Sequence, residues 1–125
     1  MDRYTTVQRA PISTNKSIQV WRKTEGLCWY CGKDFKDRMT IDHVQPVSQG
    51  GSDELDNLVP CCKSCNSAKG GRSVDEYRLV IQRKKGMILE LKQIMWLYSK
   101  GIEVPDPDPC LFYFETHNLK EHSND

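Results

Sequence analysis

The sequence lacks any long apolar run. Its longest clean apolar stretch covers residues 94–98, whereas a helix that crosses a membrane needs about 20 apolar residues. The first residues include Asp2, Arg3 and Arg9 and show no apolar segment of the kind that directs secretion. We therefore expect no membrane partner and a soluble, intracellular protein of the cytoplasm.

The sequence also lacks a substantial net charge, since 18 basic and 17 acidic residues leave +1 at pH 7. This balance hides an uneven distribution along the chain. Residues 62–100 contain nine basic and three acidic residues, whereas residues 101–125 contain one basic and six acidic residues. A basic central segment is typical of a nucleic-acid-binding protein but also of a solvated helix face, so charge alone leaves both open.

The length and composition fit one small domain. A chain of 125 residues, 38% of them hydrophobic, can bury one modest core. We expect a single domain over residues 1–125, with a motif-bearing core at about 26–72. A helical extension at 73–101 and an acidic tail at 102–125 would follow this core.

Four of the six cysteines form two Cys-x-x-Cys pairs: Cys28, Cys31, Cys62 and Cys65. Two such pairs provide the four thiolates of a tetrahedral zinc site, and Gly32 permits a tight turn after the first pair. Disulfides rarely persist in reducing cytosol, which favours metal over a disulfide framework. The spacing therefore predicts one structural Zn²⁺ ion. We expect Cys61 and Cys110 to be buried as apolar side chains.

The first half of the chain is predicted to mix helix and strand. Apolar residues at helical spacing favour a helix over residues 17–25. A β-branched, apolar stretch favours a strand over 39–44. The second cysteine pair is expected to lead into a short helix over 62–69, ended by the glycines at 70–71.

The second half is predicted to be mainly helical. Ser73 and Glu76 have the spacing of a capping box, and apolar residues from Tyr77 to Tyr98 recur at helical intervals. These features predict one long helix, or two broken near Gly86, over residues 74–100. The apolar stripe would face the core or a second copy of the chain. Residues 111–114 would form an edge strand or an aromatic plug.

Polar residues that could bind a metal ion or activate water lie between and beside the cysteine pairs. Asp42 and His43 end the predicted strand, and Asn66 directly follows the last paired cysteine. Asp42 and Asn66 can supply the oxygen ligands that Mg²⁺ prefers. An imidazole beside such an ion can take a proton from water near neutral pH. Together these groups suffice to attack a phosphodiester bond.

The order of these residues resembles the HNH endonuclease family, the ββα-metal nucleases. The resemblance rests on Cys-x2-Cys, Asp-His, Gly-Gly, Asn-Leu, Cys-x2-Cys-Asn and Lys, over about residues 26–72. It implies an α+β fold, a small ββα-metal module pinned by a four-cysteine zinc site, here with a helical C-terminal extension. It also implies metal-dependent hydrolysis of phosphodiester bonds in double-stranded DNA. The family includes phage and restriction nucleases, which is consistent with a bacterial or phage setting.

The resemblance assigns a role to each matching residue. His43 would be the general base that activates water, and Asp42 would bind the catalytic metal. Asn57 would brace the loop that aims the histidine, and Asn66 would complete the metal site. Because the last position is Asn, the chain resembles the H-N-N variant of the family. A neutral amide favours Mg²⁺ or Mn²⁺ over Ni²⁺ or Zn²⁺ as the catalytic ion.

Two further expectations concern the substrate. Lys69 and Arg72 would contact the DNA phosphates, as basic residues at that place often do in the family. One such active site cuts one strand, so a double-strand break needs a homodimer or two separate nicks.

An alternative from a different functional class is a non-catalytic zinc module that binds nucleic acid or protein. It would share the four paired cysteines and the basic segment. Such a module has no need of Asp42, His43 and Asn66, and this trio favours the enzyme. The same residues do not distinguish a DNA substrate from RNA.

Overall fold

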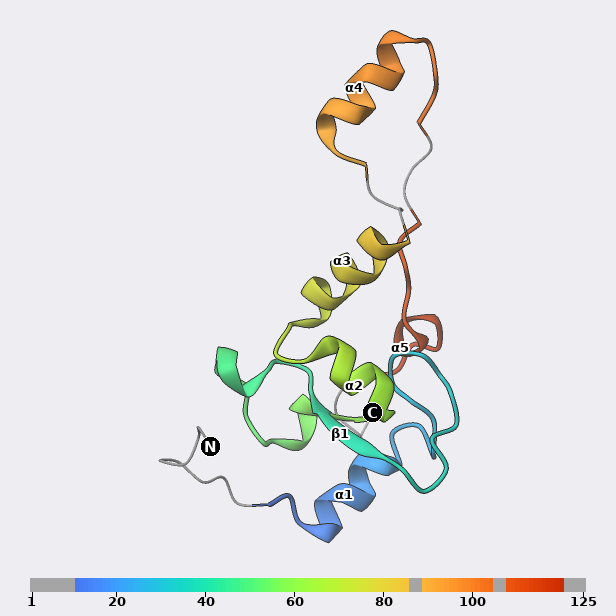
Figure 1. The fold of residues 1–125 in the computed structure, drawn as a ribbon. Coiled ribbons are helices and arrows are strands. Elements are labelled where there is room, and N and C mark those ends of the chain that lie inside the picture. Colours follow the sequence, from blue (N-terminus) through green and yellow to red (C-terminus); the bar gives the residue numbers. More distant parts are fainter. Residues whose placement is uncertain (1–10, 86–88, 105–107, 121–125) are drawn as a thin grey trace.

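A computed structural model describes residues 11–85, 89–104 and 108–120. Over these residues the protein has a small α+β fold with one two-stranded sheet, as the family resemblance implies (Figure 1). The described elements are, in chain order, α1 (Thr14–Trp21), β1 (Thr40–His43), η1 (Val47–Gln49), η2 (Leu55–Asn57), β2 (Leu58–Cys61), α2 (Lys63–Lys69), α3 (Val74–Lys84), α4 (Leu91–Ser99) and α5 (Tyr113–Thr116), where η marks a 3-10 turn. In these described ranges, no helix is long and apolar enough to cross a membrane.

The sheet and α2 form a ββα unit. β1 and β2 pair antiparallel, with His43 opposite Leu58, and α2 begins two residues after β2 ends. The strand predicted over 39–44 and the helix predicted over 62–69 are confirmed, and Gly70 caps the helix. β2 carries no alternation of polar and apolar residues because all four of its residues are buried. For that reason it was expected only through the family resemblance.

The first helix differs from its predicted bounds of 17–25. The Ser13 side chain accepts a hydrogen bond from the Lys16 amide, and this cap starts the helix at Thr14. The helix ends at Trp21. After this end, the positive φ angles of Glu25 and Gly26, 56° and 108°, turn the chain toward the first cysteine pair.

Two helices, rather than one long helix, follow the ββα unit. The capping box of Ser73 and Glu76 is present at the start of α3. α3 ends at Lys84 and α4 begins at Leu91, while Gly86 lies outside the described residues. Tyr77 on α3 is buried, but α4 stands apart from the other elements (Figure 1) and its apolar side chains are exposed: Leu91, Met95, Trp96 and Tyr98. The core interpretation of the apolar stripe is therefore wrong for α4.

The C-terminal aromatic segment returns to pack against the residues between Cys28 and Cys31. The ring of Phe114 stacks on Trp29 with centroids 5.2 Å apart, and Phe112 stacks on Tyr77 at 5.4 Å. The segment acts as an aromatic plug and forms α5, so the edge-strand alternative is wrong. Cys110, expected to be buried, is only half-buried, whereas Cys61 is fully buried as expected.

Candidate metal centre and active site

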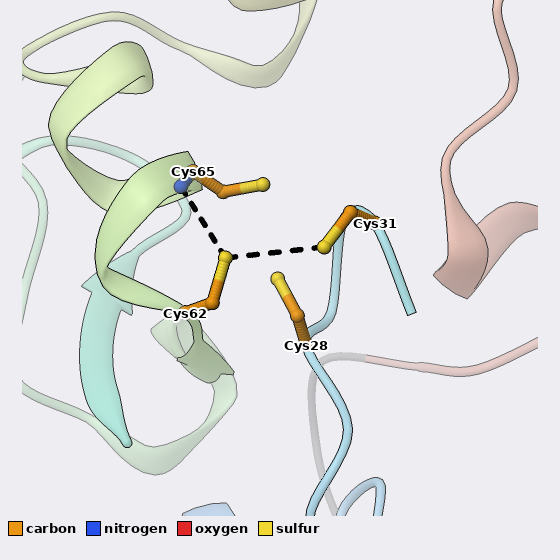
Figure 2. Close-up of side chains that lie close together, drawn as sticks. All are labelled: Cys28, Cys31, Cys62 and Cys65. Atoms are coloured by element: carbon orange, nitrogen blue, oxygen red, sulfur yellow. Dashed lines mark hydrogen bonds between the residues drawn. The ribbon is translucent and has the colours of Figure 1, made fainter. Parts of the chain in front are cut away.

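The four paired cysteines converge at one place. Their sulfur atoms all lie within 4.8 Å of one another. Figure 2 shows Cys28 and Cys31, on one segment of the chain, pointing toward Cys62 and Cys65 at the start of α2. The Sγ atoms of Cys31 and Cys62 are 3.9 Å apart, and all six cysteines are free thiols. The chain thus positions Cys28, Cys31, Cys62 and Cys65 to bind one metal ion, as their spacing predicts.

The first cysteine pair depends on Gly32 for its tight turn. Gly32 has a φ of 77°, and a Cβ added there would lie 2.6 Å from the ring of Tyr113. Any larger residue would therefore strain the backbone and collide with the aromatic plug. The glycine allows the turn to pass directly against Tyr113 of α5.

The four clustered thiols affect one another's protonation. Hydrogen bonds from Cys61 and Cys65 lower the pKa of the Cys28 thiol, whereas the hydrogen bond to Cys28 raises the pKa of Cys65. Burial raises the pKa of Cys31. Four thiolates at this separation repel one another without a positive charge between them. A divalent cation with a preference for sulfur, such as Zn²⁺, suits this donor set.

A surface hollow of about 250 Å³ lies beside the ββα unit. Its lining includes Asp42 and His43 from β1 and Asn66 from α2, together with η1 and the Gly70-Gly71 turn. The three residues that the sequence analysis singled out for hydrolytic chemistry thus share one cavity. They meet there because β1 ends at the hollow and α2 crosses beside that end.

His43 is held by a carboxylate that the sequence analysis did not identify. Its Nε2 atom lies 2.8 Å from Oδ1 of Asp53. The two side chains are partly buried, with exposed fractions of 23% and 35%. Asp53 belongs to the loop between η1 and η2, ten residues after the histidine. Nothing in the spacing of motif residues indicates this pairing.

Asp42 is buried, and both of its carboxylate oxygens contact neighbouring side chains. Its Oδ2 accepts a hydrogen bond from the Tyr30 hydroxyl at 2.6 Å, and the Lys69 ammonium lies 3.2–3.3 Å from its two oxygens. Burial raises the pKa of the Asp42 carboxyl, while the Tyr30 hydrogen bond and the Lys69 charge act to lower it. Burial and the Asp42 charge raise the pKa of Tyr30, so its hydroxyl stays a donor.

The position of Lys69 differs from the expected phosphate contact. Its side chain is fully buried and also donates to the carbonyl oxygen of His43 at 2.9 Å. A buried carboxylate requires a partner, and the ammonium of Lys69 meets that need for Asp42. In this arrangement the ammonium does not reach the surface where a phosphate would bind. Arg72, by contrast, is exposed and donates to the carbonyl of Ala68 at the end of α2.

Asn66 and Asn57 have different surroundings. The Asn66 side-chain amide donates from Nδ2 to Thr40 Oγ1 at 2.9 Å. Among the described residues, none donates a hydrogen bond to its Oδ1. The Asn57 side chain instead joins both ends of the η1 loop, since it donates to the carbonyls of Ser52 and Gln45 and accepts from the Gln45 amide.

The comparison with protein-family models agrees with this geometry. Residues 28–72 match the model of the HNH endonuclease family. We refer to this matching stretch as the HNH domain. This HNH domain contains both cysteine pairs, the ββα unit and the three residues that share the hollow.

Two curated proteins resemble the HNH domain. One is the type IV methyl-directed restriction enzyme EcoKMcrA of Escherichia coli (strain K12), 33% identical over 58 residues. The other is the SPbeta prophage-derived protein YoqL of Bacillus subtilis (strain 168), whose name describes it as a putative HNH endonuclease. It is 30% identical over 59 residues. The matches cover 39% and 40% of this chain but only 21% and 26% of the relatives. This chain thus spans about a quarter or less of these relatives.

Proposed function

We infer that this chain is a metal-dependent endonuclease that hydrolyses phosphodiester bonds in DNA. The observation that carries this inference is the meeting of His43, Asp42 and Asn66 around one hollow within the HNH domain. A module that only binds nucleic acid would gain nothing from placing an imidazole beside two oxygen ligands. The restriction enzyme among the relatives supports DNA as the substrate.

His43 acts in this proposal as the general base. A water molecule in the hollow would give its proton to the imidazole while its oxygen bonds to the phosphorus. The phosphorus–oxygen bond to the leaving sugar would break, and the leaving oxygen would take a proton from solvent. Asn57 braces the loop around the histidine through its hydrogen bonds to Ser52 and Gln45. Because the loop is fixed before substrate arrives, the base needs little reorganisation.

Asp42 and Asn66 would hold the catalytic divalent ion. A carboxylate has about four lone-pair sites, so Asp42 retains capacity beyond its contacts with Tyr30 and Lys69. The Oδ1 atom of Asn66 adds a second hard oxygen donor, and two oxygens with waters suit Mg²⁺ or Mn²⁺. When bound, such an ion supplies stabilisation of the negative charge on the phosphate and the leaving oxygen. The four cysteines would hold a structural Zn²⁺.

Double-stranded DNA is the proposed substrate. Arg72 is exposed at the end of α2, next to the glycines that line the hollow, and there it would contact a phosphate. One hollow provides one histidine and therefore cuts one strand. A break in both strands requires two copies of the chain or two successive nicks.

Cleavage of supercoiled plasmid tests the proposal. The zinc-loaded protein should nick the plasmid in Mg²⁺ or Mn²⁺ and leave it intact when EDTA is added only long enough to remove the loosely held ion. Retained zinc, measured in the same sample, controls for loss of the fold. DNA binding without cleavage in either divalent ion would instead favour the non-catalytic zinc module.

A further inference from the structure

We propose that Asp53 is a positioning residue for His43, which fixes the imidazole with its proton on Nε2 and leaves Nδ1 to accept the proton of water. This role rests on the proposed nuclease function and assigns the proton-accepting atom within it. Asp53 lies outside the Asp-His, Asn and Cys-x2-Cys-Asn positions that carry the family resemblance.

The first step is the hydrogen bond itself. Asp53 Oδ1 lies 2.8 Å from His43 Nε2, well within hydrogen-bond distance. An ionised carboxylate can only accept hydrogen bonds, so Nε2 must carry the proton in this pair. A neutral imidazole has a single N–H, and its other nitrogen is then the acceptor. The pair therefore selects Nδ1 as the basic atom.

The second step is the surroundings of the ring. Among the described residues, none is hydrogen-bonded to His43 Nδ1, and the residue lines the hollow together with Asn66. The backbone of His43 is held too, because its carbonyl accepts from Lys69 at 2.9 Å. His43 is thus held at its backbone carbonyl and at ring atom Nε2. Its other ring nitrogen, Nδ1, is left to contact a water in the hollow.

The third step is the support of Asp53. The Lys16 ammonium on α1 donates to the Asp53 carbonyl at 2.8 Å. Asn57 donates to the preceding carbonyl, that of Ser52, at 2.8 Å. A Cβ on Gly51 would collide with the Gln45 carbonyl oxygen, so only glycine allows the loop to pack this closely. Lys16 of α1, Asn57 of η2 and the close packing of Gly51 thus fix the loop that carries the Asp53 carboxylate before substrate binds.

This support connects the middle Asn of the motif to the histidine. Asn57 holds the carbonyl of Ser52, and the next residue presents the carboxylate to His43. The brace that the family resemblance implies would then act through Asp53. A carboxylate that merely stabilised the loop would leave the tautomer of His43 unaffected, and this difference can be measured.

The decisive measurement is ¹⁵N NMR of the histidine rings in zinc-loaded protein, at a pH where the rings are neutral. The chain has three histidines, and the signals missing from His43→Ala identify His43. In the wild type we expect a protonated, pyrrole-like Nε2 and an unprotonated, pyridine-like Nδ1. In Asp53→Ala this state should give way to a mixture of tautomers. A wild-type ring protonated on Nδ1, or an unchanged ring in Asp53→Ala, would overturn the proposal.

Cleavage kinetics provide the second readout. Asp53→Ala should slow single-turnover cleavage by about 10²-fold, because a misdirected base loses most of its effect, while the Kd for DNA stays within about twofold. Glu54→Ala is the matched control, since it removes an adjacent, exposed acidic side chain that makes no capping hydrogen bond. It should cut like the wild type. Equal rates for Asp53→Ala and Glu54→Ala would contradict the positioning role.

The two readouts separate this inference from the proposed function. A wild-type protein that cuts no DNA in Mg²⁺ or Mn²⁺ would refute the nuclease function. The NMR measurement would still decide whether Asp53 sets the state of His43, and it needs only the wild type if Asp53→Ala fails to fold.

Discussion

The most informative single residue in the structure is Lys69. Its ammonium is buried against Asp42 and the carbonyl of His43, which places one positive charge behind the two central residues of the hollow. The sequence singles out Lys69, but it does not indicate that the side chain points into the protein. A basic residue at a helix end usually faces solvent, and only the burial of Asp42 explains why this one turns inward.

Replacement of Lys69 by Met should destabilise the protein by about 3 kcal/mol, because it leaves a buried carboxylate without its charged partner. Urea unfolding of zinc-loaded protein measures this change. The double variant Asp42→Asn/Lys69→Met should be less destabilised than Lys69→Met alone, because no unpaired charge is left. Lys63→Met on the exposed part of α2 is the control and should unfold like the wild type. A Lys69→Met protein with wild-type stability would contradict the buried pair.

At the scale of elements, the first cysteine pair joins the sulfur cluster to the hollow. Tyr30 lies between Cys28 and Cys31, and its hydroxyl contacts Asp42 on β1. α2 makes the same connection from the other side, since it carries Cys65 and Asn66 as neighbours. A metal ion in the cluster would therefore fix the elements that position the proposed active site.

Cys65→Ser should remove this metal ion and much of the fold. Structural zinc binding is coupled to folding, so we expect the midpoint of thermal unfolding to fall by more than roughly 10 °C and the zinc content to fall from about one ion per chain to nearly none. Cys110→Ser, at a half-buried thiol outside the cluster, is the control. A Cys65→Ser protein that keeps its zinc and melts like the wild type would remove the cluster from this account.

A second connection between elements joins α3 to α5. The Arg78 guanidinium donates to both oxygens of Glu115, at 2.7 and 2.8 Å, and also packs over the ring of Phe112. The hydrogen bonds from Arg78 hold the pKa of Glu115 below its ordinary value of 4.5. This ion pair thus ties α3 to the aromatic plug, whose rings pack on Trp29 and Tyr77.

Glu115→Gln should therefore destabilise the protein by about 1 kcal/mol at neutral pH, the range of a well-formed surface ion pair. Because the folded-state pKa is lowered, the contribution is present above 4.5 and is lost as the pH falls through the folded-state value. Thermal unfolding of wild type and variant as a function of pH measures this, and the difference should shrink below pH 4.5. Glu103→Gln, at an exposed position, is the control. A difference that persists in acid would contradict the assignment.

At the scale of the whole molecule, the sequence predicts the site better than its surroundings. Each Cys-x2-Cys pair is a local pattern, and the family resemblance marks the Asp-His, Asn and Asn positions. The structure brings His43, Asp42 and Asn66 together. Asp53 was missed because its contact with His43 arises from the path of a loop. For α4 the core alternative was wrong, because helical periodicity reports an apolar face but not what covers it.

The aromatic plug shows the same limit of sequence reasoning. The residues at 112–114 are apolar enough for a strand, yet they form the start of a short helix. Their conformation follows from contacts with Trp29 and Tyr77, which are distant in sequence. Local propensity is a weak guide where such tertiary packing decides.

The central claim is that the HNH domain cuts DNA with His43 as its base. The most direct test compares plasmid cleavage by His43→Ala, Asp42→Ala and Asn66→Ala over a range of Mg²⁺ and Mn²⁺ concentrations. A weakened metal ligand is offset by mass action, so more metal should partly restore Asp42→Ala and Asn66→Ala. His43→Ala should fold and bind DNA like the wild type, cut about 10²-fold or more slowly, and gain nothing from added metal. His43→Ala cleavage at the wild-type rate, or its recovery with metal, would contradict the account.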